Sequence, residues 1–476
     1  MATDRLTGLD TAFLCMDQPT APMNMGGVAV FAPPQPVHPT RIVELLLARA
    51  ERIPQLRQRL RTSWLPFGSA CWEDDPGFVV NRHVYAHRLG TPRYHGQLAA
   101  RVATIMAEPL DTTRPPWQLH LITGLAGGRF AIVAKLHHAL ADGASATMLA
   151  LGLLDGAAEQ APPSPAARPA EQRTPWPLGQ PVRMLTEAAS AAGGLPERLR
   201  RTGEVVDIAS AVARNARRAP SSPLLAPPSG RRRITTLRVE LEHIRRIRRQ
   251  HGGTTNDVLL ATLAGALRQW LGERGHRVDT LPVRAFVPVS RRPNPHDAQC
   301  AGNRLSGYLC DLPIGEPDPL RRLHTIRGTM DANKRAGDRC GAGAIPVLAE
   351  TLPAAVHRLA TPLLGRHAAL LFDTVVTNVP LPNMPLYFDG AELREIYPLV
   401  PLAYGHGLAV AFCTYRDIVH IGLHADAATL PDVDRLGEVI PDTVNAMWEP
   451  PAVPLSQRPV RPVRRLASRQ PVRRGA

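Results

Sequence analysis

Two adjacent histidines, an aspartate and a glycine fall within seven residues of the sequence, at His137, His138, Asp142 and Gly143. A histidine can take a proton from a hydroxyl group near neutral pH, because the pKa of a free imidazole is about 6.5. An aspartate four residues later can hold the loop or select the imidazole tautomer. A glycine lets a substrate approach the backbone, where an N–H group can face a developing oxyanion. Adjacent histidines alone are more often structural than catalytic, but the complete set in this order favours proton-transfer chemistry.

The segments around this histidine motif, residues 137–143, predict how it is positioned. Residues 118–125 suit a strand, Gly127 and Gly128 indicate a hairpin, and residues 130–136 form a nearly continuous apolar run. Such a run is typical of a central strand that is buried on both faces. Residues 146–154 then have a helical pattern, with Ser145 as the expected N-cap. The motif is therefore expected where a buried strand gives way to a loop and a helix, a frequent place for catalytic groups.

A second polar pair, Asn256 and Asp257, opens another apparent helix. Apolar residues follow it at helical spacing, namely Val258, Leu260, Leu263, Leu267 and Leu271. The side chain of Thr255 or Asn256 can accept backbone N–H bonds, and the carboxylate of Asp257 suits a helix N-terminus. One interpretation of this pair is therefore helix capping.

The sequence HHALADG at 137–143 resembles the HHxxxDG motif of the CoA-dependent acyltransferase superfamily, and the chain is more narrowly similar to the bacterial wax ester synthase/diacylglycerol acyltransferases. Further segments that resemble this family are LTGLDTAF at 6–13, PTAPM at 19–23, PLDTTRPPW at 109–117, TNDVLLA at 255–261, RAFVPVS at 284–290, GNRLS at 302–306, TNVP at 377–380, PLY at 385–387 and GHGL at 405–408. Pro116 stands where the family pattern leads us to expect leucine. The resemblance runs from about residue 5 to residue 449, and it rests on the order and spacing of these blocks together.

The resemblance implies an α/β fold of two chloramphenicol-acetyltransferase-like domains with a central tunnel between them. It implies that His138 is a general base, which deprotonates an acceptor hydroxyl for attack on an acyl-CoA thioester without an acyl-enzyme intermediate. His137 and Asp142 would then position the loop, and Gly143 would allow substrate access. The implied donor is a long-chain acyl-CoA, and the acceptor is diacylglycerol or a long-chain alcohol. No cofactor is implied, because acyl-CoA is itself a substrate.

Three residues outside the histidine motif are further site candidates by the same resemblance. The loop at Asn256 and Asp257 would reach the tunnel and support the site, as an alternative or an addition to capping. Arg284 would pair with Asp142 and support the catalytic loop.

The composition along the chain suggests four parts. Residues 1–160 form an N-terminal acyltransferase domain with the motif, 161–233 a Pro/Arg-rich linker with a helix at 202–218, 234–449 a C-terminal acyltransferase-like domain, and 450–476 a disordered basic tail. The net charge is +15, but residues 161–233 hold twelve arginines against five acidic residues, and the tail holds seven arginines and no acidic residue. The rest of the chain is therefore close to neutral, at +1. Charge thus says little about the chemistry, and the tail is expected either to bind anionic lipid or to have no role.

Composition also excludes several classes of protein. The chain is 44% hydrophobic and 20% charged, which is typical of a globular protein. None of the six cysteines forms a C-x-x-C pair or a Cys/His cluster, so no metal site is expected. With 5% aromatic residues and no nucleic-acid motif, no nucleic-acid partner is expected. We see no secretion signal and no membrane-spanning segment, so the protein is expected in the cytoplasm, peripheral at the inner face of the plasma membrane or on lipid droplets.

Two other functions remain open at the level of sequence. One is a condensation-type acyltransferase that acts on another hydroxyl acceptor, such as a polyketide. The other is a catalytically silent lipid-binding homologue on the same fold. The intact His138, Asp142 and Gly143 argue against the silent homologue.

Overall fold

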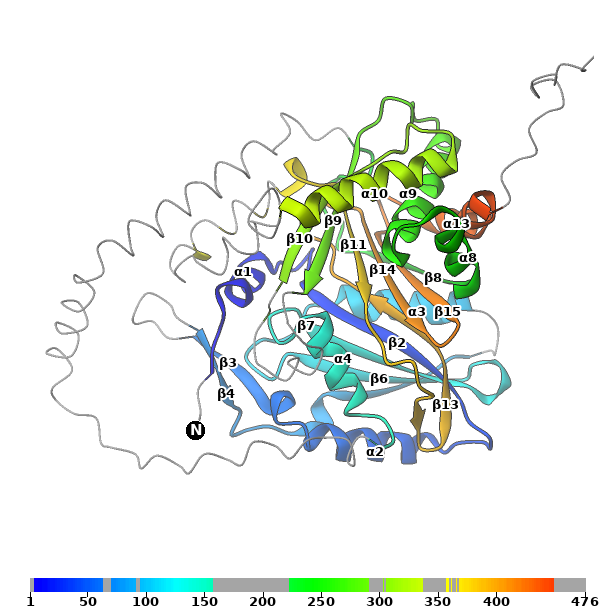
Figure 1. Cartoon of the computed structure of the whole chain (residues 1–476). Coiled ribbons are helices and arrows are strands. Elements are labelled where there is room, and N and C mark those ends of the chain that lie inside the picture. The colour runs from blue at the N-terminus through cyan, green and yellow to red at the C-terminus, as the bar shows by residue number, and fades with distance from the viewer. Residues whose placement is uncertain are drawn as a thin grey trace, which may run out of the picture.

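The computed structural model describes residues 4–62, 70–90, 95–156, 222–290, 303, 305–336, 357–358, 361, 365 and 368–448. The helix expected at 202–218 and the tail at 450–476 lie outside these residues. Two six-stranded sheets form the framework, and helices pack against both (Figure 1). The α/β class that the sequence predicts is confirmed.

The first sheet contains the strand that leads into the histidine motif. Its strand order is β12-β13-β2-β7-β6-β5. The bounds are β2 (Asn24–Ala32), β5 (Val84–Arg88), β6 (Trp117–Thr123), β7 (Phe130–His137), β12 (Tyr387–Phe388) and β13 (Ala391–Leu399). β7 lies inside the sheet between β2 and β6 and is buried along almost its whole length. The predicted central strand is thus confirmed, as is its antiparallel pairing with β6.

The second sheet is built from the later part of the chain. Its strand order is β10-β9-β11-β14-β15-β8, and β11 runs parallel to both of its neighbours. The bounds are β8 (Arg232–Glu240), β9 (Val283–Ser290), β10 (Leu305–Leu312), β11 (Thr374–Val379), β14 (Leu408–Tyr415) and β15 (Ile418–Asp426).

One strand joins the two halves of the molecule, which are the described residues up to 156 (the first half) and those from 222 onward (the second half). β13 comes from the second half of the chain but pairs with β2 in the first sheet. It also touches the second sheet, because a Cβ atom on Gly422 of β15 would lie 2.1 Å from the carbonyl oxygen of Pro398. Only glycine allows this close approach of two backbones. The region 234–449 therefore contributes strands to both sheets, since β12 and β13 complete the first sheet.

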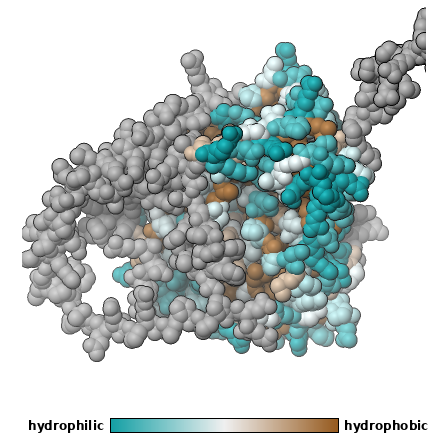
Figure 2. Space-filling model, in the orientation of Figure 1, coloured by the Kyte–Doolittle hydropathy of each residue, from teal (hydrophilic) through white to brown (hydrophobic). Residues whose placement is uncertain are grey.

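Helices cover the sheets and enclose three apolar clusters. α2 (Pro39–Glu51) packs on one face of the first sheet, and α3 (His95–Ala107) lies on the other face against β8. α8 (Leu241–His251), α9 (Thr255–Glu273), α10 (Pro319–Ala336) and α13 (Val433–Trp448) pack together on the second sheet. α9 is buried along most of its length, whereas hydrophilic residues cover much of the visible surface of this helical layer (Figure 2).

The N-terminal segment lies next to the strand that carries the motif. α1 (Gly8–Met16) precedes β2, and a small sheet of β1 (Asp4–Arg5), β4 (Ala70–Asp74) and β3 (Gln58–Thr62) flanks it. Short 3-10 helices occur at Pro54–Arg57, Val80–Arg82, Ala126–Gly128 and Ala368–Leu370.

The predicted N-caps of two helices are wrong. The helix after the motif, α4 (Gly143–Leu151), begins at Gly143, and its N-cap is Asp142 rather than Ser145. α9 is capped by Thr254, one residue before the expected candidates. In both cases a short side chain with an oxygen acceptor satisfies a backbone N–H at the helix start, and more than one such residue lies nearby, at Asp142 and Ser145 and at residues 254–257.

Among the described helices, none has the length and apolar character needed to cross a membrane. In the same residues, no group of three or more His, Cys, Asp and Glu side chains could hold a metal ion.

Candidate active site

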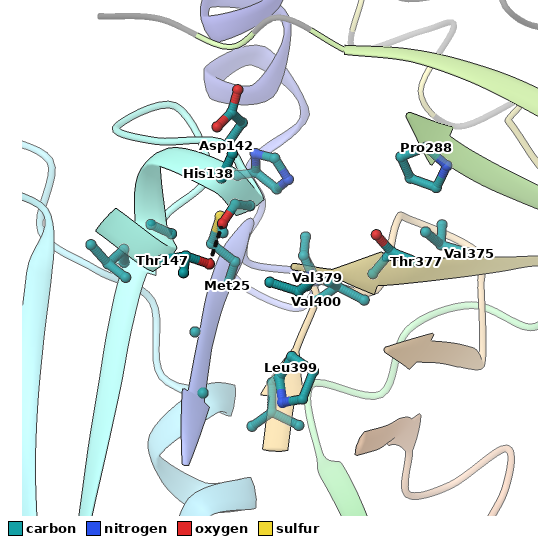
Figure 3. Close-up of a pocket in the computed structure, with 18 of the residues that line it drawn as sticks. Met25, His138, Asp142, Thr147, Pro288, Val375, Thr377, Val379, Leu399 and Val400 are labelled. Atoms are coloured by element: carbon teal, nitrogen blue, oxygen red, sulfur yellow. Dashed lines mark hydrogen bonds between the residues drawn. The ribbon is translucent and has the colours of Figure 1, made fainter. Parts of the chain in front are cut away.

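A cavity of about 780 Å³ lies where the two halves meet, and its wall is almost entirely apolar. The first half contributes residues of α1, β2, β7 and α4, and the second half contributes residues of β9, β11 and β13. Figure 3 shows His138 on one side of this space, with Pro288, Thr377 and Val379 of the second half across from it. The position of His138 between the halves agrees with the expected site between two domains.

The imidazole of His138 forms part of the cavity wall. The ring of Phe13 stacks on it, with 4.0 Å between ring centroids, and the backbone N–H of His138 donates to the carbonyl of Met23 at 2.9 Å. Burial lowers the pKa of His138 to about 4, although its own carbonyl, Asp142 and Asn303 favour the protonated ring. The ring is therefore neutral at pH 7 and able to accept a proton.

His137 lies on the other face of β7 and is fully buried. Its Nδ1 accepts the backbone N–H of Ala139 at 3.1 Å, so the neutral ring carries its proton on Nε2. Nε2 lies 3.7 Å from the carboxylate of Asp17, whose other oxygen accepts the N–H of Met23 at 2.7 Å. His137 thus contacts the loop backbone and is not among the residues that line the cavity.

Asp142 and Gly143 form the turn from the loop into α4. The Oδ1 atom of Asp142 accepts the backbone N–H of Ser145 at 2.8 Å, and its carboxylate points away from the imidazole of His138 (Figure 3). A Cβ atom on Gly143 would meet no atom within 4 Å, so packing does not require glycine there. Gly143 lines the cavity, and the first N–H groups of α4 have no acceptor within the helix.

Three residues near His138 were not singled out as site residues from the sequence: Asp10, Phe13 and Asn303. Asn303 is fully buried, and its Nδ2 donates to the carbonyl of His138 at 2.8 Å and to the Oδ1 of Asp10 at 2.5 Å. Asp10 in turn closes a capping box with Thr7 at the start of α1. The sequence did contain a signal for them, because the blocks at 6–13 and 302–306, which resemble the family, contain all three residues.

The other site candidates lie away from the cavity. The carboxylate of Asp257 accepts the N–H of Thr254 at 2.7 Å, and neither Asn256 nor Asp257 lines the cavity. The geometry therefore fits the capping interpretation and does not bring this pair to the site. Arg284 does not make the expected pair with Asp142, because its Nε donates to Asp311 on the adjacent strand β10 at 2.5 Å. Antiparallel pairing puts these two residues directly opposite each other, which makes the local ion pair the simpler solution.

A neutral histidine in an apolar cavity between two α/β halves is the arrangement expected of a CoA-dependent acyltransferase. The model of the wax ester synthase/diacylglycerol acyltransferase catalytic domain matches residues 6–259, and that of the WS/DGAT C-terminal domain matches residues 301–447. The chain therefore belongs to the wax ester synthase/diacylglycerol acyltransferase family, as the sequence motifs indicate.

Individual relatives agree with this assignment. The chain is 32% identical over 448 residues to the Mycobacterium tuberculosis protein named "Probable diacyglycerol O-acyltransferase tgs1". The aligned region covers 93% of this chain and 95% of that protein. A wax ester synthase/diacylglycerol acyltransferase structure from Marinobacter aquaeolei VT8 matches with a TM-score of 0.67 and 25% identity, over 93% of this chain and 98% of the other. The first condensation domain of the CDA synthetase shares the fold, with a TM-score of 0.56 and 17% identity over 94% of this chain and 98% of that chain.

Proposed function

We propose that this protein transfers an acyl group from a long-chain acyl-CoA to the hydroxyl of diacylglycerol, and also of long-chain alcohols, with His138 as the general base. The observation that carries the proposal is the neutral imidazole in the wall of an apolar cavity between the halves. The names of the relatives in the same family support these substrates.

In this reaction, Nε2 of His138 takes the proton of the acceptor hydroxyl as its oxygen attacks the thioester carbonyl. The C–S bond then breaks, and the imidazolium returns the proton to the CoA thiolate. The ester forms with no covalent enzyme intermediate, so no nucleophilic side chain is required. The N–H groups of Gly143 and Ala144, in the first turn of α4, would stabilise the oxyanion, because a helix N-terminus favours negative charge.

The cavity wall supports acceptors with long hydrocarbon chains. Beyond His138, the cavity continues along the first sheet, where side chains of one apolar cluster line it, among them Phe31, Leu46 and Phe388. Transfer of alkyl chains from water to such a wall is favourable by about 0.8 kcal/mol for each CH₂ group. A polar acceptor would gain little there.

We further propose that the protein works at the inner face of the plasma membrane or on lipid droplets, since its acceptors reside in lipid. The seven arginines of the tail at 450–476 would add about 1 kcal/mol each near an anionic surface. Removal of residues 450–476 should then reduce binding to anionic liposomes at low salt and leave turnover in detergent unchanged. Unaltered liposome binding would leave no membrane role for the tail.

The direct test offers purified protein palmitoyl-CoA together with dioleoylglycerol or hexadecanol. We expect triacylglycerol from the first acceptor and wax ester from the second, and loss of both products in His138→Ala. No ester from either acceptor would contradict the proposed substrates and favour a condensation-type acceptor. Wild-type turnover by His138→Ala would contradict the role of the base.

A further inference from the structure

Asn303 is a buried asparagine of the second half that holds the backbone of His138. Its Nδ2 lies between two oxygens, the carbonyl of His138 at 2.8 Å and the Oδ1 of Asp10 at 2.5 Å. Its backbone N–H donates to the same Asp10 oxygen at 3.0 Å. A flipped amide would place its own oxygen against these two acceptors, so the orientation of the amide is fixed by its partners.

This orientation leaves the Oδ1 atom of Asn303 facing away from Asp10. Among the described residues, Oδ1 of Asn303 and Nδ1 of His138 are both buried and both lack a hydrogen-bond partner. One is an acceptor and the other becomes a donor when it carries a proton. Buried polar atoms are normally paired, and the Asn303 side chain is among the groups that favour protonation of the His138 ring.

From this pair of complementary atoms we infer that Asn303 is a positioning residue, whose Oδ1 accepts the Nδ1–H of His138 and keeps Nε2 free as the base. The inference rests on the proposed function of His138. The bond forms in the substrate complex, where catalytic hydrogen bonds often tighten. Asp10 and the capping box at the start of α1 fix the amide from behind.

The same bond contributes most after proton transfer. Once Nε2 has taken the hydroxyl proton, the ring is cationic and its Nδ1–H becomes a stronger donor to Asn303. The titratable groups that face the ring are His137, which disfavours the charge, and Asp142, which favours it, and the carbonyl of His138 itself also favours the charged ring. Asp10 lies behind the amide. Asn303 therefore lowers the energy of the imidazolium and should affect kcat more than KM.

The test uses the full chain labelled with ¹⁵N-histidine, with the His138 signals assigned from a His138→Gln spectrum. In the wild-type protein with acyl-CoA bound, we expect Nδ1 to be protonated and Nε2 unprotonated in the neutral ring. In Asn303→Ala we expect a mixture of tautomers, a fall in kcat of roughly 10- to 100-fold, and a KM for acyl-CoA within about twofold. The control Asn333→Ala removes another asparagine bond to a carbonyl, from Asn333 to Leu309 at 2.9 Å, and should change neither tautomer nor kcat.

A wild-type His138 with its proton on Nε2 would overturn the inference, even if Asn303→Ala did not fold. An unchanged tautomer in Asn303→Ala would also overturn it and leave only a structural role. The proposed function fails separately, through ester formation by His138→Ala, whatever the tautomer is.

Discussion

The low pKa of His138 makes a quantitative prediction about the acid limb of the pH–rate profile. The neutral ring is the active form, and burial lowers its pKa from an ordinary 6.5 to about 4. At pH 5, a base with a pKa of 4 is still about 90% neutral, whereas a base with a pKa of 6.5 is only about 3% neutral. We therefore expect kcat/KM to be almost the same at pH 5 as at pH 7, and to reach half its plateau near pH 4.

The assay measures initial rates of hexadecyl palmitate formation from palmitoyl-CoA and hexadecanol between pH 4 and pH 8. The ester product is extracted and quantified directly, because the response of reagents that detect the free CoA thiol itself depends on pH. A sample returned from pH 5 to pH 7.5 must recover its activity, which separates titration from unfolding. A midpoint near pH 6.5, with full recovery, would refute the burial of His138 as the cause of its protonation behaviour.

Three further predictions test the cavity, the strand pairing and the buried histidines. Ala150 lines the cavity, so Ala150→Phe places a ring there, and we expect the ratio of kcat/KM for palmitoyl-CoA to kcat/KM for octanoyl-CoA to fall about tenfold or more. The control Met148→Phe, on the exposed side of α4, should leave this ratio unchanged. Gly26→Ala brings a Cβ atom to 1.9 Å from the carbonyl oxygen of Ala134, so we expect a loss of about 1–3 kcal/mol in the free energy of unfolding by urea. At Gly90 a Cβ atom would meet no atom within 4 Å, so an equal loss in Gly90→Ala would contradict this reasoning. Burial also lowers the pKa of His420 and of His424 to about 4, so the unfolded chain binds protons that the native protein does not. The free energy of unfolding should then fall as pH drops from 6.5 towards 4, by about 2 kcal/mol for each ring at pH 5, and a flat urea midpoint between pH 7 and pH 5 would exclude this.

Local features of the site could be predicted from the sequence, because they depend on neighbours in the chain. The apolar run before His137 can only be buried, and in the structure it is the central strand β7. The family blocks gave the fold class and the location of His138 between two halves. Helix starts were less certain, because Asp142 and Ser145 are both good caps and the sequence does not show which one the chain uses.

Contacts between distant segments could not be predicted in the same way. Nothing in residues 391–399 shows that this strand pairs with β2 rather than with its neighbours in the chain. Asn303 is a polar residue in a loop, and only the fold reveals that it is buried against Asp10 and His138, which lie 293 and 165 residues away in sequence. Arg284 does not pair with Asp142 for the same reason, since strand pairing places Asp311 directly opposite it.

The site has to meet two opposing demands, and the polar groups around His138 show how they are balanced. Long acyl and alkyl chains require an apolar cavity, and the same apolar surroundings disfavour the imidazolium and lower the pKa of the base to about 4. A general base works best when its pKa lies near the working pH, so a wholly apolar wall would hold lipid well and catalyse poorly. The groups that oppose the effect of burial are few and belong to different segments: the carbonyl of His138 itself, Asp142 at the start of α4, and Asn303 from the second half. Asn303 is not among the residues that line the cavity, and the carboxylate of Asp142, which borders it, accepts the backbone N–H of Ser145. We therefore expect substitutions in the apolar wall to change which chains are accepted, and substitutions behind the ring to change the rate for every chain alike.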